Sequence, residues 1–113
     1  MDREKIQLSL RTVPEDIDIY IFGSYLFSEY PKDVDLIVIY NSNIYNGKNI
    51  FDKCLNLIIQ LETKSGLPVD VTYLSIIEEN EIGFLKIVNA MPIKDVFYIP
   101  IETNGKTSRQ MIK

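Results

Sequence analysis

Runs of β-branched and aromatic residues along the chain predict a small set of strands. They cover residues 17–22, 34–40 and 67–74, and a fourth, shorter strand is expected at 95–99. Such runs favour extended backbone because branched side chains pack well on a pleated surface. The run at 34–40 is almost continuously apolar, which is typical of a strand covered on both faces.

Helical spacing fills the segments between these strands. The longest expected helix covers residues 50–64, where apolar side chains share one broad face and Gly66 stands at the position of a C-cap. The next helix begins at Ser75, which forms a capping-box pattern with Glu78, and it reaches about residue 89. Both helices therefore carry their own boundary signals.

Weaker signals complete the pattern. Residues 2–11 and 24–30 are expected to form short helices, and residues 41–49 a loop. Gly83 weakens the continuity of the helix that follows Ser75. The alternation of helices and strands predicts an α/β (α+β) layered fold, in which a small mixed sheet of three to five strands packs with helices.

The length of 113 residues predicts one domain that covers residues 1–113. Residues 102–113 are polar, and we expect them to form a disordered tail. No apolar run is long enough to span a membrane, and the charged N-terminus does not resemble a signal peptide. The single cysteine, Cys54, cannot form an internal disulfide, so the cytoplasm is the expected compartment.

Charge and histidine content narrow the chemistry further. The formal net charge is −4, without the basic excess that phosphate contacts require, so a nucleic-acid partner is not expected. The chain contains no histidine, which excludes His-based catalysis and His-ligated zinc. Acid–base or metal chemistry must then use carboxylates, tyrosine, lysine or the lone cysteine.

Two aspartates, Asp33 and Asp35, open the strongest predicted strand. Residues i and i+2 of a strand point to the same face, so the two carboxylates lie side by side while Val34 points into the core. Like charges so placed repel, and a hard cation such as Mg²⁺ or Mn²⁺ relieves the repulsion, although an Asp-x-Asp alone is more often a solvated pair. Asp16 and Asp18 are interpreted as such a solvated pair, because no phosphate-binding turn precedes them.

Gly23 and Ser24 strengthen the metal-site interpretation, because they stand at a strand-to-helix turn. Glycine lets the backbone approach a ligand closely, and free N–H groups at a helix start favour a phosphate. The alternative is an ordinary N-cap after a tight turn. A strand ending in Gly-Ser, then a short helix, then an Asp-x-Asp that opens an apolar strand is a much rarer combination.

A known family shares this combination, which is carried here by Phe22-Gly23-Ser24 and Asp33-Val34-Asp35-Leu36-Ile37-Val38. Over roughly residues 15–90, the chain resembles the minimal nucleotidyltransferases of the polymerase-β-like superfamily, and it is similar to kanamycin nucleotidyltransferases and to the antitoxin partners of HEPN-domain toxins. The resemblance implies a polymerase-β-like fold. It also implies that Gly23 and Ser24 bind the β- and γ-phosphates of a nucleoside triphosphate.

The family carries a third carboxylate on the next strand of the sheet, and Asp70 matches that position. It lies in the apolar segment 67–74, where a buried charge needs a partner or a metal. The alternative is that Asp70 caps a helix or faces solvent on an edge strand. The sequence departs from the family between Ser24 and Asp33, where the family's Gly and Arg are absent and only Lys32, interpreted as solvated, is basic.

The resemblance implies a metal-dependent nucleotidyltransferase that moves a nucleoside monophosphate, AMP from ATP, onto a hydroxyl of a protein or a small molecule. Asp33, Asp35 and Asp70 are the expected catalytic and metal-ligating residues, around two Mg²⁺ ions or Mn²⁺. The acceptor would arrive with a HEPN-type partner protein or a second copy of the chain. The alternative is a non-catalytic binding module, such as an antitoxin that binds a HEPN-type toxin.

The aromatic residues after the Gly-Ser turn have two interpretations. Tyr25, Phe27 and Tyr30 either stack a base or face a partner, or they belong to the core, where we expect Phe27. Cys54 lies on the apolar face of the long predicted helix and is expected to be a buried, inert thiol.

Overall fold

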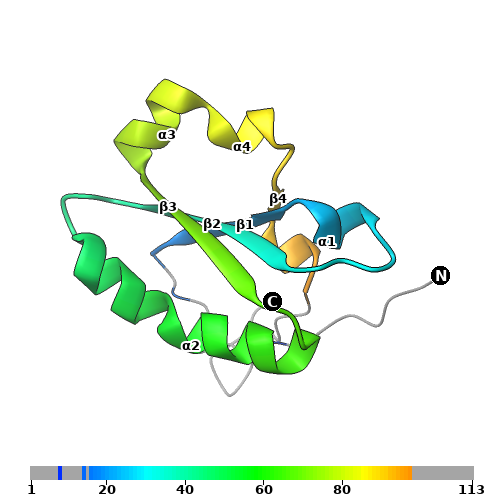
Figure 1. The fold of residues 1–113 in the computed structure, drawn as a ribbon. Coiled ribbons are helices and arrows are strands. Elements are labelled where there is room, and N and C mark those ends of the chain that lie inside the picture. Colours follow the sequence, from blue (N-terminus) through cyan, green and yellow to red (C-terminus); the bar gives the residue numbers. More distant parts are fainter. Residues whose placement is uncertain (1–7, 9–13, 15, 98–113) are drawn as a thin grey trace, which may run out of the picture.

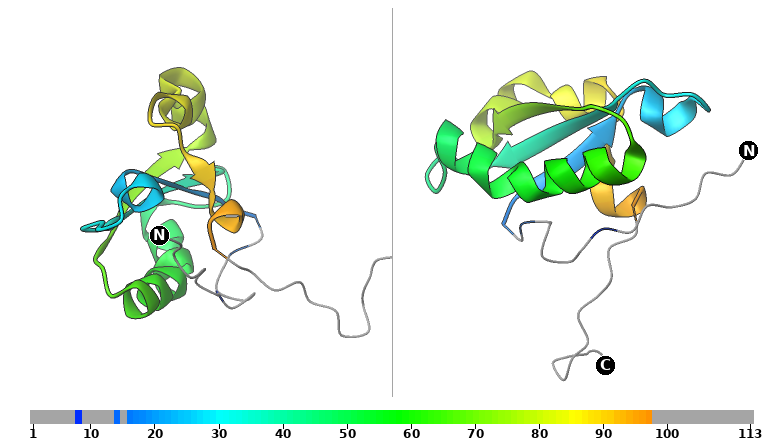
Figure 2. Two further views of the ribbon diagram at one scale, coloured as in Figure 1. Left: turned by 90° about the vertical axis from the view of Figure 1, so that its right-hand side faces the viewer. Right: turned by 60° about the horizontal axis from the view of Figure 1, so that its bottom comes forward.

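The computed structural model describes Leu8, Pro14 and residues 16–97, which form a four-stranded mixed sheet with helices on both faces (Figure 1). The elements are β1 (Asp18–Phe22), α1 (Ser24–Phe27), β2 (Val34–Tyr40), α2 (Gly47–Ser65), β3 (Val69–Ser75), α3 (Ile76–Ile82), α4 (Phe84–Ile87), β4 (Met91–Pro92) and the 3₁₀ helix η2 (Ile93–Asp95). The turned views in Figure 2 show α2 on one face of the sheet and α3 with α4 on the other. This arrangement confirms the predicted fold class.

The strand order in the sheet is β3-β2-β1-β4. β2 pairs antiparallel with β1 and parallel with β3, while β4 pairs antiparallel with β1. A parallel pair needs a crossover connection, which α2 supplies between β2 and β3. The start of β2 consequently lies between the end of β1 and the start of β3.

The main core lies between the sheet and α2. Alternate residues of each strand point into it, and the residues between them point to the opposite face. Its buried members include, from β1 and β2, Ile19, Ile21, Val34, Leu36 and Val38 and, from α2, Ile50, Cys54, Leu57 and Leu61. Cys54 is therefore a core residue, as expected. The opposite face carries the acidic residues of β2 and β3.

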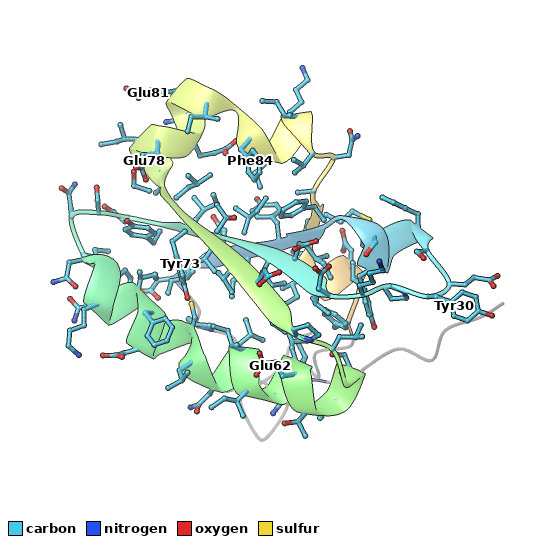
Figure 3. The ribbon with its side chains drawn as sticks, viewed as in Figure 1. Tyr30, Glu62, Tyr73, Glu78, Glu81 and Phe84 are labelled. Carbon is cyan, nitrogen blue, oxygen red and sulfur yellow. The ribbon has the colours of Figure 1, made fainter. Side chains whose placement is uncertain are left out.

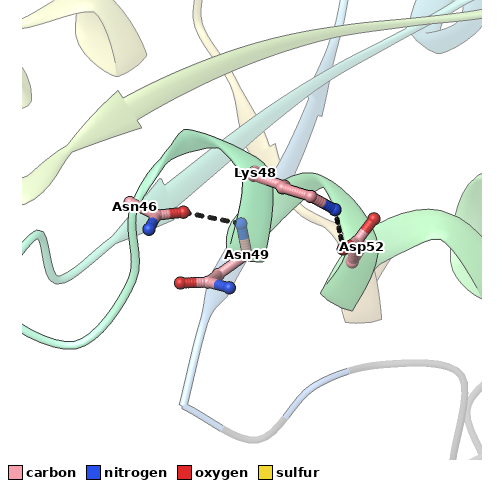
Figure 4. A network of polar contacts seen from close by, with 4 residues as sticks. All are labelled: Asn46, Lys48, Asn49 and Asp52. Atoms are coloured by element: carbon pink, nitrogen blue, oxygen red, sulfur yellow. Dashed lines mark hydrogen bonds and ion pairs between the residues drawn. The ribbon is translucent and has the colours of Figure 1, made fainter.

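The long helix α2 begins three residues before the predicted start, because Asn46 provides a cap. The Asn46 side chain accepts a hydrogen bond of 2.8 Å from the backbone N–H of Asn49 (Figure 4). One turn on, Lys48 and Asp52 form an exposed ion pair of 3.3 Å, which adds little stability in water. Gly66 ends the helix in the left-handed conformation, as predicted.

The capping box at the start of α3 forms as the sequence predicts. The Ser75 hydroxyl accepts from the N–H of Glu78, and the Glu78 carboxylate accepts from the N–H of Ser75. The expected single helix to about residue 89 is wrong, however, because Gly83 adopts a φ of 70° and ends α3. The carboxylate of Glu79 then accepts N–H groups of Phe84 and of the following residue, which starts the separate helix α4.

The expected strand at 95–99 is wrong in its described part. The short strand β4 lies earlier, at Met91–Pro92, and pairs with Tyr20 and Ile21 of β1. The chain then turns through η2, which brings the buried Phe97 against Tyr25, with ring centroids 5.7 Å apart. Phe97 thus packs as a core residue at the end of a turn and not in a strand.

The helix expected at 24–30 is shorter than predicted, since α1 ends at Phe27. The Phe27 side chain is 81% exposed, so its expected place in the core is also wrong, and Tyr25 takes the buried position instead. The helix predicted at 2–11, apart from Leu8, and the tail predicted at 102–113 lie outside the described residues. Within the described part of the chain, no helix is both long and apolar enough to cross a bilayer.

Candidate functional site

The start of β2 brings three predicted site residues to one face of the sheet. Asp35 in β2 is the direct partner of Asp70 in β3 and of Phe22 in β1. Directly opposite residues of neighbouring strands project their side chains to the same face. The sheet therefore forms a row of Phe22, Asp35 and Asp70 on the face opposite α2.

The carboxylates of Asp33, Asp35 and Asp70 converge at this point. One oxygen from each lies within 4.8 Å of the other two. Asp33 and Asp35 are half-buried, and Asp70 is exposed at the sheet edge. Asp33 precedes the strand, so its position beside Asp35 depends on the turn that leads into β2.

Burial and repulsion among these acids act on Asp35. Burial raises the pKa of the Asp35 carboxyl above its ordinary value, and the charges of Asp33 and Asp70 and a hydrogen bond with Asp33 raise it further. No lysine or arginine in the described chain forms an ion pair with the cluster. Among the described residues, the three carboxylates therefore have no ion-pair partner that would offset their repulsion.

The donor set fits a hard divalent cation. Mg²⁺ binds carboxylate oxygens at roughly 2.1 Å, so two opposite ligand atoms lie about 4 Å apart around the ion. The 4.8 Å limit on the separations among the oxygens of Asp33, Asp35 and Asp70 is close to that span. Small side-chain rotations would bring the carboxylates into ligating positions.

Gly23 lies directly against this cluster. Its backbone has φ 86° and ψ −160°, a conformation that is essentially reserved for glycine. A Cβ at this position would lie 2.5 Å from Oδ2 of Asp35. Ser24 follows as the first residue of α1, so the Gly-Ser turn brings the backbone of Gly23 to the edge of the acidic cluster.

An aromatic pair borders the site, and the sequence analysis did not identify it. The rings of Phe22 and Phe84 meet edge to face, with centroids 5.7 Å apart. Figure 3 shows Phe84 projecting from α4 toward the sheet. Strand alternation placed Phe22 on the face of Asp35, but the position of Phe84 depends on the break at Gly83.

Other residues considered from the sequence are not members of the cluster. Asp16 accepts a hydrogen bond of 2.5 Å from the Tyr45 hydroxyl, and Asp18 is exposed. Neither belongs to the group of acids that could hold a metal ion in the described chain. Tyr30 is 83% exposed, and Lys32 is also exposed.

Comparison with known proteins agrees with the geometry. The family model described as nucleotidyltransferase domain matches residues 3–100, which is most of the chain. No match was found among curated proteins or among solved structures. The matched region includes every residue of the acidic cluster and the Gly-Ser turn. The chain belongs to the nucleotidyltransferase domain family.

Proposed function

We propose that this protein transfers a nucleoside monophosphate, AMP from ATP, to a hydroxyl group of a protein or small-molecule acceptor. The observation that carries the proposal is the convergence of Asp33, Asp35 and Asp70 within 4.8 Å of one another, beside a glycine turn. Membership of the nucleotidyltransferase domain family supports transfer chemistry in general. The identity of the base and the identity of the acceptor belong to the proposal and not to the family assignment.

Each residue has a role that follows from its position. Asp33 and Asp35, at the half-buried centre, would hold two Mg²⁺ ions, or Mn²⁺, with Asp70 joining them. Bound divalent cations supply charge neutralisation for the phosphates and for the attacking and leaving oxygens. Gly23 and Ser24 would bind the triphosphate, because the glycine lies directly against the carboxylate of Asp35 and therefore beside the proposed metal site.

The exposed Asp70 is the carboxylate that an acceptor reaches first. An acceptor hydroxyl placed there attacks the α-phosphorus and forms a new P–O bond, while the bond to the bridging oxygen of pyrophosphate breaks. The hydroxyl proton passes to the Asp70 carboxylate, and pyrophosphate leaves. Asp70 therefore has two roles, as a ligand and as the proton acceptor.

A second candidate function is a non-catalytic binding module, such as an antitoxin that binds a HEPN-type toxin. Exposed apolar side chains on α3 and α4 favour a protein partner, because Ile77, Ile82 and Ile87 are 61%, 53% and 67% exposed. The two candidate functions differ in one measurable respect: the enzyme would consume the triphosphate, and the binding module would not.

The test incubates the protein with Mg²⁺ and α-labelled ATP, CTP, GTP or UTP, with and without candidate acceptors. We expect label to be transferred from ATP, and transfer to be lost in Asp33→Ala, Asp35→Ala and Asp70→Ala. Asp18→Ala is the matched control, because Asp18 is an exposed strand acid outside the cluster. Absence of triphosphate binding in the presence of Mg²⁺ would contradict the enzymatic proposal and favour the binding module.

A further inference from the structure

The strand β3 forms one edge of the sheet in the described chain, because β2 is its only neighbouring strand there. The Pro68 carbonyl accepts a hydrogen bond of 2.9 Å from the N–H of Val34, so even-numbered residues of β3 turn their backbone groups toward β2. The N–H and C=O groups of Val71 and Tyr73 then point outward. Outward groups of this kind are a template for an added strand.

Carboxylates close the two ends of this edge. Glu62 accepts the N–H of Val69 at 3.4 Å, and Glu78 accepts the N–H of Ser75 at 2.8 Å. Figure 3 shows Glu62 at the start of β3 and Glu78 beyond its end, with Tyr73 between them. The open part of the edge is therefore short and has an acidic side chain at each end.

The flank of α2 continues this edge as an apolar surface. Phe51, Leu55 and Ile59 form one stripe, because successive members are four residues apart. They are 47%, 38% and 51% exposed. Glu62 lies one turn beyond Ile59 on the same stripe, and its bond to Val69 places this end of the stripe at the outer side of β3.

The charges decide which occupant fits. A second copy that paired antiparallel through the same edge would bring Glu62 of one chain against Glu78 of the other at both ends. Like charges directly opposite are unfavourable, and the net charge of −4 adds to the repulsion. An extended segment of another protein, with a basic residue at each end and apolar residues between, complements both the carboxylates and the stripe.

We propose that the outer edge of β3 binds such a segment of a partner protein by β-strand addition. Its backbone would pair with Val71 and Tyr73, and alternate side chains would rest on the stripe of Phe51, Leu55 and Ile59. The remaining side chains lie on the face of Asp70 and Thr72. A hydroxyl opposite Asp70 is then one strand spacing, about 4.8 Å, from the backbone of that residue.

In this position the acceptor would be a serine or threonine hydroxyl of the docked segment. This part of the proposal rests on the proposed nucleotidyl transfer. The hydroxyl oxygen bonds to the α-phosphorus of the nucleoside triphosphate, pyrophosphate departs with its bridging oxygen, and Asp70 takes the proton. Docking itself needs no nucleotide. Binding and transfer can therefore be measured separately.

The probe is the peptide Lys-Thr-Val-Thr-Val-Thr-Lys, labelled with fluorescein through a flexible linker. Its alternation places valine toward the stripe and threonine toward Asp70 in either strand direction. We expect saturable binding by fluorescence anisotropy, about tenfold tighter than for the matched peptide with glutamate at both ends. The Glu62→Gln/Glu78→Gln double variant keeps both acceptor oxygens and should lose most of that preference.

A second variant tests the backbone pairing. Val71→Pro removes an outward N–H that β2 does not use, so an edge strand tolerates it, and we expect peptide binding to be lost. Val71→Ala is the control, because it also loses the valine side chain but keeps the N–H, and it should retain binding. Circular dichroism checks that both variants are folded. If Val71→Pro does not fold, the two peptides still test the proposal. The lysine-ended peptide should bind more tightly than the glutamate-ended peptide, and the Glu62→Gln/Glu78→Gln variant should lose that preference.

Three results would overturn the docking proposal. They are no binding of the lysine peptide, equal binding of the two peptides, and a wild-type dimer in sedimentation that Val71→Pro dissociates. Addition of Mg²⁺ and α-labelled ATP should label threonine in the bound peptide. Binding without labelling would contradict the transfer step while leaving the docked strand intact.

Discussion

The Cα of Gly23 faces the carboxylate of Asp35 so closely that any side chain would collide with it. A Cβ on Gly23 would meet Oδ2 of Asp35 at 2.5 Å, a separation that real Cβ atoms essentially never show. The glycine and the aspartate come from different strand ends, and the antiparallel pairing of β1 with β2 brings them together. The identity of residue 23 therefore controls the position of a proposed metal ligand.

Substitution Gly23→Ala tests this contact. We expect the free energy of unfolding to fall by about 1–3 kcal/mol, because alanine cannot adopt the backbone conformation without strain, and Mg²⁺ binding to be lost, because the methyl group displaces Asp35. Gly83→Ala is the matched control, since Gly83 also has positive φ but open space around it. Thermal unfolding with and without Mg²⁺ measures both effects, and equal Mg²⁺ responses in the two variants would contradict the prediction.

Neutralising Asp35 should separate stability from metal binding. In the absence of metal, Asp35→Asn removes repulsion with Asp33 and Asp70, so we expect a melting temperature roughly 2–4 °C above that of the wild type at neutral pH. Saturating Mg²⁺ should raise the melting temperature of the wild type and leave that of the variant unchanged. Differential scanning calorimetry in EDTA and in Mg²⁺ tests both statements, and a less stable metal-free variant would refute the first.

The buried thiol of Cys54 predicts a loss of stability in alkali. Burial raises the pKa of this thiol from 9.0 to about 11, so the unfolded chain ionises it first. The contribution of the protonated thiol to the free energy of unfolding is fully present below pH 9. It is lost as the pH rises toward 11, because the folded state keeps the proton to a higher pH than the unfolded chain. Urea unfolding at several pH values measures the slope of the free energy of unfolding against pH.

Cys54→Ala provides the comparison for that slope. The cavity lowers its free energy of unfolding at every pH, but the fall between pH 9 and 11 should be shallower than in the wild type. Burial also raises the pKa of Tyr20, which contributes in both proteins. Burial and the charge of Cys54 raise the pKa of Tyr73, and the part due to Cys54 is absent from the variant. Identical slopes in the two proteins would show that the thiol contributes nothing.

Tyr73→Phe should leave the protein as stable or make it more stable, by up to about 1 kcal/mol. The Tyr73 hydroxyl is buried and has no hydrogen-bond partner among the described residues, so its removal deletes an uncompensated polar group. Tyr45→Phe is the contrasting variant, because it removes the exposed hydrogen bond to Asp16 and should be less stable than the wild type. Chemical denaturation ranks the two variants, and the reverse order would contradict this explanation.

The sequence predicted the geometry of the acids because local rules determine it. The two-residue spacing predicted Asp33 beside Asp35, although the turn before β2 positions Asp33. A strand–helix–strand unit aligns β3 beside β2, which brings Asp70 next to Asp35. The start of α3 was predicted for a similar reason, since the capping box needs only Ser75 and Glu78. Features that depend on near neighbours, or on one standard crossover, are readable from the chain.

The errors come from contacts distant in the sequence. The break at Gly83 lets Glu79 cap a new helix, and α4 then directs Phe84 onto Phe22, which no local pattern indicates. Phe27 was expected in the core from helical spacing, but α1 ends at that residue and leaves its ring in solvent. A four-residue helix has too few turns for periodicity to indicate its buried face.

The parallel pairing of β2 with β3 has a consequence for folding kinetics. Asp35 and Asp70 become neighbours only when β3 pairs with β2 across the α2 connection, so the site depends on a contact of long sequence separation. Contacts of that kind slow folding, because closing a long loop costs entropy before the contact forms. A chain that has collapsed without completing this crossover cannot bring the acids together. The cation affinity proposed for them should therefore appear during refolding only when the native topology is reached.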